Sequence, residues 1–69
     1  ENLFEALRHY RMERARKEKV PPYVIASDRT LRDITLLRPA TLDELELAHG
    51  IGPAKAKKYG TDLLAVVNR

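Results

Sequence analysis

The sequence predicts a compact all-α bundle of four main helices. Three separate helix-start signals support this fold class: a cap at Ser27 or Asp28, the capping box Thr41-x-x-Glu44, and Pro53, which suits a first helical position. Apolar residues recur at helical spacing around these signals. Because the chain has 69 residues, we expect one small domain over its full length, and the absent initiator Met indicates a fragment of a larger protein.

The first helix is expected over about residues 2–18, and it ends at the Val-Pro-Pro run that starts at Val20, because proline cannot continue a helix. Its apolar stripe contains Leu3, Leu7, Tyr10 and Ala15, and Phe4 lies beside the stripe. The short apolar run from Tyr23 to Ala26 has no second run with which to pair as a strand. A helical turn or an extended buried connector is therefore expected there.

Two helices are expected next, over about residues 28–37 and 42–48, separated by Pro39. Their core-facing residues are Leu31, Ile34 and Leu37 in the first and Leu42, Leu45 and Ala48 in the second.

The last helix is expected over about residues 53–68, with a stripe of Ala56, Tyr59, Leu63 and Val67. Gly60 inside it costs about 1 kcal/mol relative to alanine, so either the helix bends there or another helix crosses closely. The residues predicted to be buried are Leu7, Leu31, Ile34, Leu45 and Leu63.

Composition excludes several classes of function. The chain has 13 basic and 10 acidic residues, a net charge of +3, and an acidic middle between basic ends, which argues against a uniform DNA-binding face. It has no cysteine, and its apolar runs are too short to span a membrane. His9 and His49 are isolated, and no nucleophile–base pair or P-loop is present. We expect no catalytic residue, no metal site and no enzymatic activity of its own.

The glycine turn is the first candidate site. Gly50 and Gly52 precede a basic helix whose N-terminus could hold a phosphate, with Lys55, Lys57 and Lys58 nearby. The alternative is a helix connector that needs glycine for its backbone alone, with lysines on a solvated face.

The first helix offers a second candidate surface. Arg8, Arg11 and Lys19 could follow a phosphate backbone, or could form a solvated face that is partly neutralised by its own glutamates, for instance Glu13 with Lys17. Tyr23, after two prolines, could stack on an unpaired base or pack against the end of this helix.

Acidic residues form a third candidate surface. Asp43, Glu44 and Glu46 lie within one short predicted helix. They favour its N-terminus electrostatically and could be a solvated face, or they could form a docking patch for a basic partner such as another part of the same polypeptide.

The order of these elements resembles a known family. A helix, a short glycine turn and a second helix are similar to the helix-hairpin-helix motifs that bind DNA backbones. The block V-P-P-Y-V-I-x-S-D-x-T-L from Val20 to Leu31, followed by Gly50-Ile-Gly52, resembles the HRDC domain (helicase and RNase D C-terminal), and most closely that of bacterial RecQ DNA helicases. The likeness runs from about Leu3 to Val67. It implies a helical bundle that holds single strands near Tyr23, although Ala26 stands where an aromatic residue is common.

This resemblance implies an accessory module of a RecQ-type helicase, in DNA repair and recombination, that modulates DNA binding and structure preference. Its expected partners are single-stranded or junction DNA, bound weakly, and other domains of the parent. The module is expected to be a monomer near the nucleoid in a bacterial cytoplasm, with ATP and Mg²⁺ only in the parent's motor. The alternatives are a protein-docking module with weak or no DNA binding and an RNA-binding domain of an RNase D-like nuclease.

Overall fold

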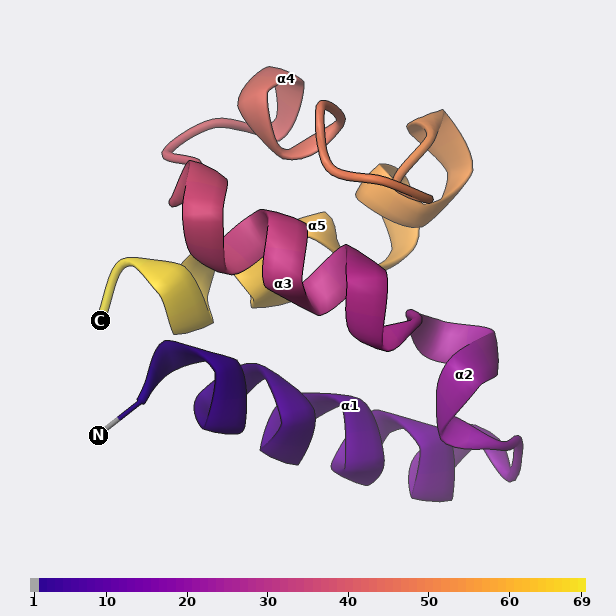
Figure 1. The fold of residues 1–69 in the computed structure, drawn as a ribbon. Helices are drawn as coiled ribbons and strands as arrows, with labels where there is room; N and C mark the ends of the chain where they lie inside the picture. Colours follow the sequence, from indigo (N-terminus) through magenta and orange to yellow (C-terminus); the bar gives the residue numbers. More distant parts are fainter. Residues whose placement is uncertain (1) are drawn as a thin grey trace.

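The computed structural model describes residues 2–69, and over this range the chain forms five helices and no strand. They are α1 (Leu3–Glu18), α2 (Pro22–Ile25), α3 (Asp28–Leu37), α4 (Leu42–Leu45) and α5 (Pro53–Val67). In Figure 1, α1 lies along the lower edge, α4 lies along the upper edge, and α3 crosses in front of α5. The predicted all-α class is confirmed, and the run after the two prolines is the short helix α2.

Local capping explains where the helices begin. The Ser27 side chain accepts a hydrogen bond from the backbone of Thr30 at 3.2 Å and so caps α3. At α4 the capping box is complete, because the Thr41 hydroxyl accepts from the Glu44 N–H at 3.1 Å and the Glu44 carboxylate accepts from the Thr41 N–H at 3.3 Å. Pro53 is the first residue of α5. All three predicted starts are confirmed.

The end predicted for the helix over 42–48 is wrong. Regular α-helix stops at Leu45, and the next bonds run from Leu47 N–H to the Glu44 carbonyl (3.1 Å) and from Ala48 N–H to the Leu45 carbonyl (3.0 Å). Bonds between residues three apart wind the chain more tightly than an α-helix. The chain therefore enters the glycine turn through a tightened last turn.

One core joins all five helices. Its buried apolar residues are Ala6, Leu7, Ala15, Ile25, Ala26, Leu31, Ile34, Leu45, Ala48, Ile51, Ala56, Tyr59, Leu63 and Val66. The five residues predicted to be buried are all among them. Leu37 and Leu42, which were also assigned to the core, are 43% and 41% exposed. Steps of three residues fall about 60° short of a full turn, so Leu37 is rotated about 120° away from Leu31 on the helix.

Gly60 marks a close crossing of α4 over α5. A Cβ at this position would lie 2.5 Å from the Leu42 Cδ2 and 3.5 Å from the Leu45 Cδ2. The glycine therefore lets the two helices approach, and the crossing explains why a residue of low helix propensity lies inside α5.

Among residues 2–69, three residues adopt left-handed backbone conformations. Lys19 (φ 58°) ends α1, Arg38 (φ 45°) ends α3, and Gly50 (φ 80°) lies in the turn before α5. Such residues commonly terminate helices, and glycine is the residue that adopts the conformation most easily. Across residues 2–69, none of the helices has the length and apolar character needed to cross a lipid bilayer.

Candidate nucleic-acid interface

The helix α2 presents an exposed aromatic ring. Ile25 and Ala26, at its end, are both 2% exposed and anchor the turn to the core. Tyr23 is 72% exposed, and its neighbour Val24 is 42% exposed. The Tyr23 ring is therefore open to a stacking partner rather than packed against α1. Ala26 is buried and adds nothing to this exposed surface.

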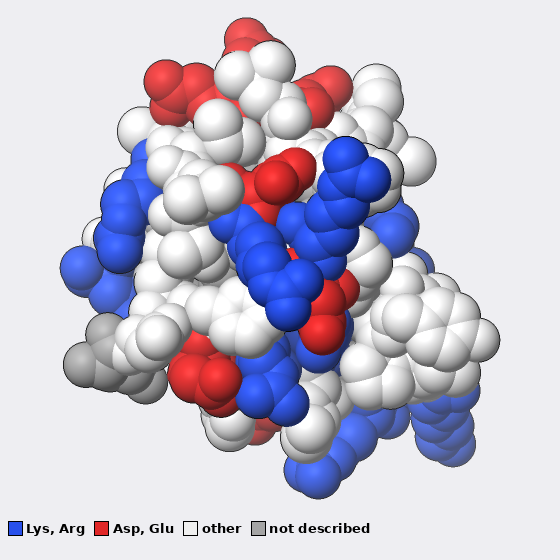
Figure 2. Space-filling model, in the orientation of Figure 1, with Lys and Arg blue, Asp and Glu red and all other residues white. Residues whose placement is uncertain are grey.

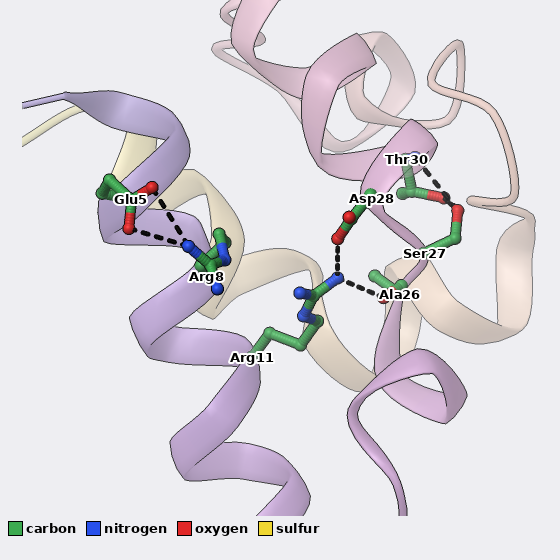
Figure 3. A network of polar contacts seen from close by, with 7 residues as sticks. All are labelled: Glu5, Arg8, Arg11, Ala26, Ser27, Asp28 and Thr30. Carbon is green, nitrogen blue, oxygen red and sulfur yellow. Dashed lines mark hydrogen bonds and ion pairs between the residues drawn. The ribbon is translucent and has the colours of Figure 1, made fainter.

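Arg11 fastens α1 to the junction between α2 and α3 (Figure 3). Its guanidinium donates to the Ala26 carbonyl at 3.1 Å and to the Asp28 carboxylate at 2.8 Å, and its side chain is only 13% exposed. The hydrogen bond from Arg11 holds the pKa of the Asp28 carboxyl below its usual range. Arg8, one turn earlier, donates to both oxygens of the Glu5 carboxylate. Both arginines are thus engaged inside the domain.

The line of contact between α1 and α5, which we call the seam, is centred on Glu18. Its carboxylate accepts hydrogen bonds from Arg14 Nε at 2.6 Å, Lys58 Nζ at 3.1 Å and Tyr59 OH at 3.0 Å. These bonds, chiefly that from Arg14, lower the pKa of Glu18 to about 2. Further along the seam, Asp62 accepts from the Tyr10 hydroxyl at 3.1 Å. Lys58 is therefore already paired with a carboxylate.

The start of α5 carries two lysines in different settings. Lys55 is three residues before Lys58, so it shares the face of α5 that meets α1, and it is half-buried. Lys57 is exposed and offset around the helix. Within the described chain, neither ammonium group has a hydrogen-bonding or ion-pair partner. The N-cap, Gly52, has no side chain with which to satisfy the first N–H groups of the helix.

The glycine turn has a backbone requirement of its own. Gly50 has a left-handed conformation, and a Cβ there would lie 2.9 Å from the Thr30 hydroxyl at the start of α3. A Cβ at Gly52 would meet no atom within 4 Å. The geometry of the backbone therefore explains why residue 50 is glycine, as expected for a simple helix connector. It does not explain glycine at position 52, which is open to solvent.

Acidic side chains are concentrated at one end of the face that Figure 2 shows, although others lie among the basic side chains elsewhere on it. Figure 2 shows acidic side chains gathered at the top of the molecule, over α4, and a largely uncharged area over α2 at the right with basic side chains below it. Asp43, Glu44 and Glu46 are all exposed on or next to α4, and Glu44 also closes the capping box. Leu47 beside them is 72% exposed. The acidic region therefore includes an exposed apolar side chain.

The fold brings together only some of the candidate residues. The contacts of Glu18 with α5 bring the end of α1 to the beginning of α5, and α2 follows α1 directly. Lys19 and Tyr23, just after the end of α1, therefore lie toward the end of the bundle at which α5 begins, where Lys55 precedes Lys58 by one turn; we call this end the α2 corner. Arg8 and Arg11 lie instead on the side of α1 that faces α3.

The sequence indicated that Glu18 could pair with basic residues of the first helix, but it did not single out Arg14 as the partner. Their spacing of four residues was a usable signal for an ion pair on one helix. The contact of Glu18 with Lys58 joins residues 40 positions apart, and no local pattern indicates it. The pairing suggested for Glu13 is replaced by a contact of its carboxylate with His9 Nε2 at 3.3 Å. Among residues 2–69 no group of three or more potential ligands could hold a metal ion.

A family model for the HRDC domain matches residues 1–67. The chain is an HRDC domain. It superimposes on a solved structure described as D. radiodurans RecQ HRDC domain 3 with a TM-score of 0.92 and 31% identity, over 97% of this chain and 88% of that one. An HRDC domain is a small accessory domain and is not catalytic.

The curated relatives are DNA helicases. The HRDC domain is 43% identical over 60 residues to the ATP-dependent DNA helicase RecQ of Bacillus subtilis, covering 87% of this chain and 10% of that protein. It is 32% identical over 66 residues to RecQ of Haemophilus influenzae, covering 96% of this chain and 11% of that protein. It is 37% identical over 67 residues to the ATP-dependent DNA helicase UvrD2 of Mycobacterium tuberculosis, covering 97% of this chain and 10% of that protein. The chain thus spans about a tenth of the length of these relatives.

Proposed function

We propose that this HRDC domain is an accessory DNA-binding module of a larger helicase of the RecQ type, and that it biases which DNA structures the parent enzyme engages. The observation that carries the proposal is the exposed ring of Tyr23 at the same end of the bundle as Lys19 and Lys55, whose ammonium groups have no partner among residues 2–69. Aromatic rings that stack on bases, combined with cations that neutralise phosphates, are the usual means of holding single strands. The names of the relatives support a helicase as the parent protein. Because UvrD2 is among them, the kinds of parent helicase to consider are not limited to RecQ.

The parent protein supplies the rest of the activity in this proposal. The motor, with its ATP and Mg²⁺, lies in other domains, and the HRDC module binds no cofactor. It acts as a monomeric unit in the bacterial cytoplasm, at the nucleoid, and its binding to single-stranded or junction DNA is weak. Weak binding suits an auxiliary contact, because the parent motor must release and rebind DNA as it moves.

The test is a titration of labelled single-stranded, duplex and junction DNA with the domain at two salt concentrations. Single-strand binding should weaken with salt by a slope of about −0.7 per phosphate neutralised. Tyr23→Ala should weaken it by about 1–3 kcal/mol, whereas Tyr23→Phe should be nearly neutral, because the ring face makes the contact. A single-stranded RNA of the same length tests the alternative of an RNase D-like parent.

Two lysine variants provide a matched pair for the same titration. Lys55→Gln and Lys57→Gln each remove one charge from α5, two residues apart, so they change the net charge equally. Because only Lys55 lies on the face toward the α2 corner, its replacement should flatten the salt slope more. Equal effects of the two variants, or no effect of Tyr23→Ala in a folded protein, would place the DNA elsewhere.

A second candidate function is docking on protein through the acidic surface of α4. The observation that favours it is that Leu47, which is 72% exposed, lies among carboxylates, a combination that fits a basic partner with an apolar anchor. Reversing Asp43 and Glu46 to lysine leaves the capping box intact. In the full-length parent this change should alter unwinding or structure preference, while the domain alone should bind DNA equally or more tightly. An unchanged full-length enzyme would leave α4 as a solvated face.

A further inference from the structure

The seam contains three hydrogen-bond donors that converge on one carboxylate. We call them the seam donors: Arg14 Nε, Lys58 Nζ and Tyr59 OH. They come from two helices and approach the Glu18 oxygens at 2.6, 3.1 and 3.0 Å respectively. Two cations and a hydroxyl around one anion form the same kind of constellation that proteins use to hold a phosphate group.

The seam donors are held in place by more than Glu18. The Tyr59 ring, which is 4% exposed, lies 5.1 Å from the Arg14 guanidinium and 5.3 Å from the Lys58 ammonium. These cation–π contacts attract both cations to the same ring whether or not the carboxylate is present. The side chains of Arg14 and Glu18 are only 23% and 20% exposed, so water screens these two charges less than it does on the open surface, whereas the Lys58 side chain is 56% exposed. The site is therefore organised in advance for an anion.

The local charge favours an anion at this position. Without Glu18, Arg14 would keep Asp62, whose carboxylate lies 3.5 Å from Arg14 Nη1 and also accepts from Tyr10, and Glu13 lines the same hollow. Lys58 would lose the carboxylate with which it pairs, and its positive charge would be uncompensated. A phosphodiester carries one negative charge and presents several acceptor oxygens, so it matches both the charge and the donors.

We propose that the seam donors form a binding site for a single phosphate group, and that Glu18 occupies this site as an internal anion. Glu18 thereby keeps Lys58 and Arg14 from contributing to DNA affinity, and phosphate contacts are confined to the neighbouring α2 corner. The effect on DNA rests on the function proposed above, whereas the anion site does not depend on it.

The site is tested with inorganic phosphate as the probe. In Glu18→Ala the seam donors are vacant, and phosphate at ten times its Kd should raise the melting temperature by roughly 6–11 °C over chloride at equal ionic strength. The wild type should show no such rise. Glu13→Ala is the matched control, because Glu13 is an exposed glutamate on the same helix whose contact is with His9. The double variant Glu18→Ala/Lys58→Ala should lose the rise.

The effect on DNA has its own comparison. Glu18→Ala should bind single strands more tightly than Glu13→Ala and with a slope steeper by about 0.7, although both variants lose one negative charge. If the two variants bind DNA equally well, Glu18 acts through net charge only, and the proposal that it keeps Arg14 and Lys58 from contributing to DNA affinity is wrong. An equal phosphate rise in wild type and Glu18→Ala would overturn the site itself. If Glu18→Ala does not fold, Glu18→Gln, which keeps the side-chain volume, is tested for the phosphate-dependent rise in melting temperature instead.

The two proposals can fail separately. Failure of every variant to bind DNA would contradict the proposed function, and the phosphate result would still show whether the anion site exists.

Discussion

Replacing Gly50 by alanine should destabilise the domain, because this residue has both a left-handed backbone and a close neighbour. Its φ is 80°, and an added Cβ would lie 2.9 Å from the Thr30 hydroxyl. Thr30 is 3% exposed, and its hydroxyl shares a hydrogen bond of 3.0 Å with the Ser27 side chain that caps α3. The new methyl group therefore has little room, and the cap of α3 would have to shift.

The magnitude follows from three contributions. The left-handed conformation costs a non-glycine residue about 1–2 kcal/mol. Weakening the Ser27 cap adds up to about 1 kcal/mol. Against this, alanine reduces the freedom of the unfolded chain, which returns about 0.4–1 kcal/mol. We expect a net loss of about 1–2 kcal/mol, which lowers the melting temperature of a domain of this size by roughly 5–15 °C.

Thermal and urea unfolding followed by far-UV circular dichroism measure this loss. Gly52→Ala is the matched control, since it lies in the same turn at φ −94°, and its Cβ would meet no atom within 4 Å. We expect the control to change stability by less than about 1 kcal/mol, because a lost N-cap preference and a stiffer unfolded chain oppose each other. A Gly50→Ala protein as stable as Gly52→Ala would refute the backbone explanation of this turn.

Two further predictions concern the polar contacts of α1. Because its carboxyl pKa is lowered to about 2, Glu18 stabilises the fold above its unfolded pKa of about 4.3, and this contribution is lost as the pH falls toward 2. The difference in melting temperature between wild type and Glu18→Gln should therefore shrink between pH 5 and pH 2 in thermal scans, and a constant difference would contradict the assigned pKa. Arg11→Ala should cost about 1–3 kcal/mol in urea unfolding, because the buried Ala26 carbonyl loses its donor. Arg8→Ala should change stability by less than about 1 kcal/mol, because its ion pair with Glu5 is exposed, and equal losses for the two arginines would show that Arg11 does not fasten the junction.

Local signals explain why the helix starts could be predicted. Capping by Ser27 and Thr41 depends on residues three positions apart, so the sequence contains the whole interaction. The end of α4 could not be predicted in the same way, because it depends on the path that the chain takes into the glycine turn. The exposure of Leu37 shows a related limit, since a stripe of residues three apart drifts around the helix.

The candidate interface was predictable only as a set of residue types. The basic residues of α1 and α5 are visible in the sequence, but their pairing is not. Arg11 is engaged with Asp28 and Lys58 with Glu18, over separations of 17 and 40 residues. The folded chain shows that Lys19 and Lys55 have no such partner among residues 2–69 and that the Tyr23 ring is exposed.

The left-handed residues that end α1 and α3 have a practical consequence for engineering. Glycine would adopt the backbone of Lys19 or Arg38 with about 1 kcal/mol less strain, but it would also give the unfolded chain about 0.4–1 kcal/mol more freedom, so the two effects nearly cancel. Lys19 lies at the α2 corner, where its charge has a proposed use, whereas Arg38 precedes Pro39, whose carbonyl accepts from Asn68 beyond the far end of α5. Replacing Arg38 by glycine is thus expected to change the stability of the HRDC domain little, and replacing Lys19 by glycine would in addition remove a charge from the proposed interface.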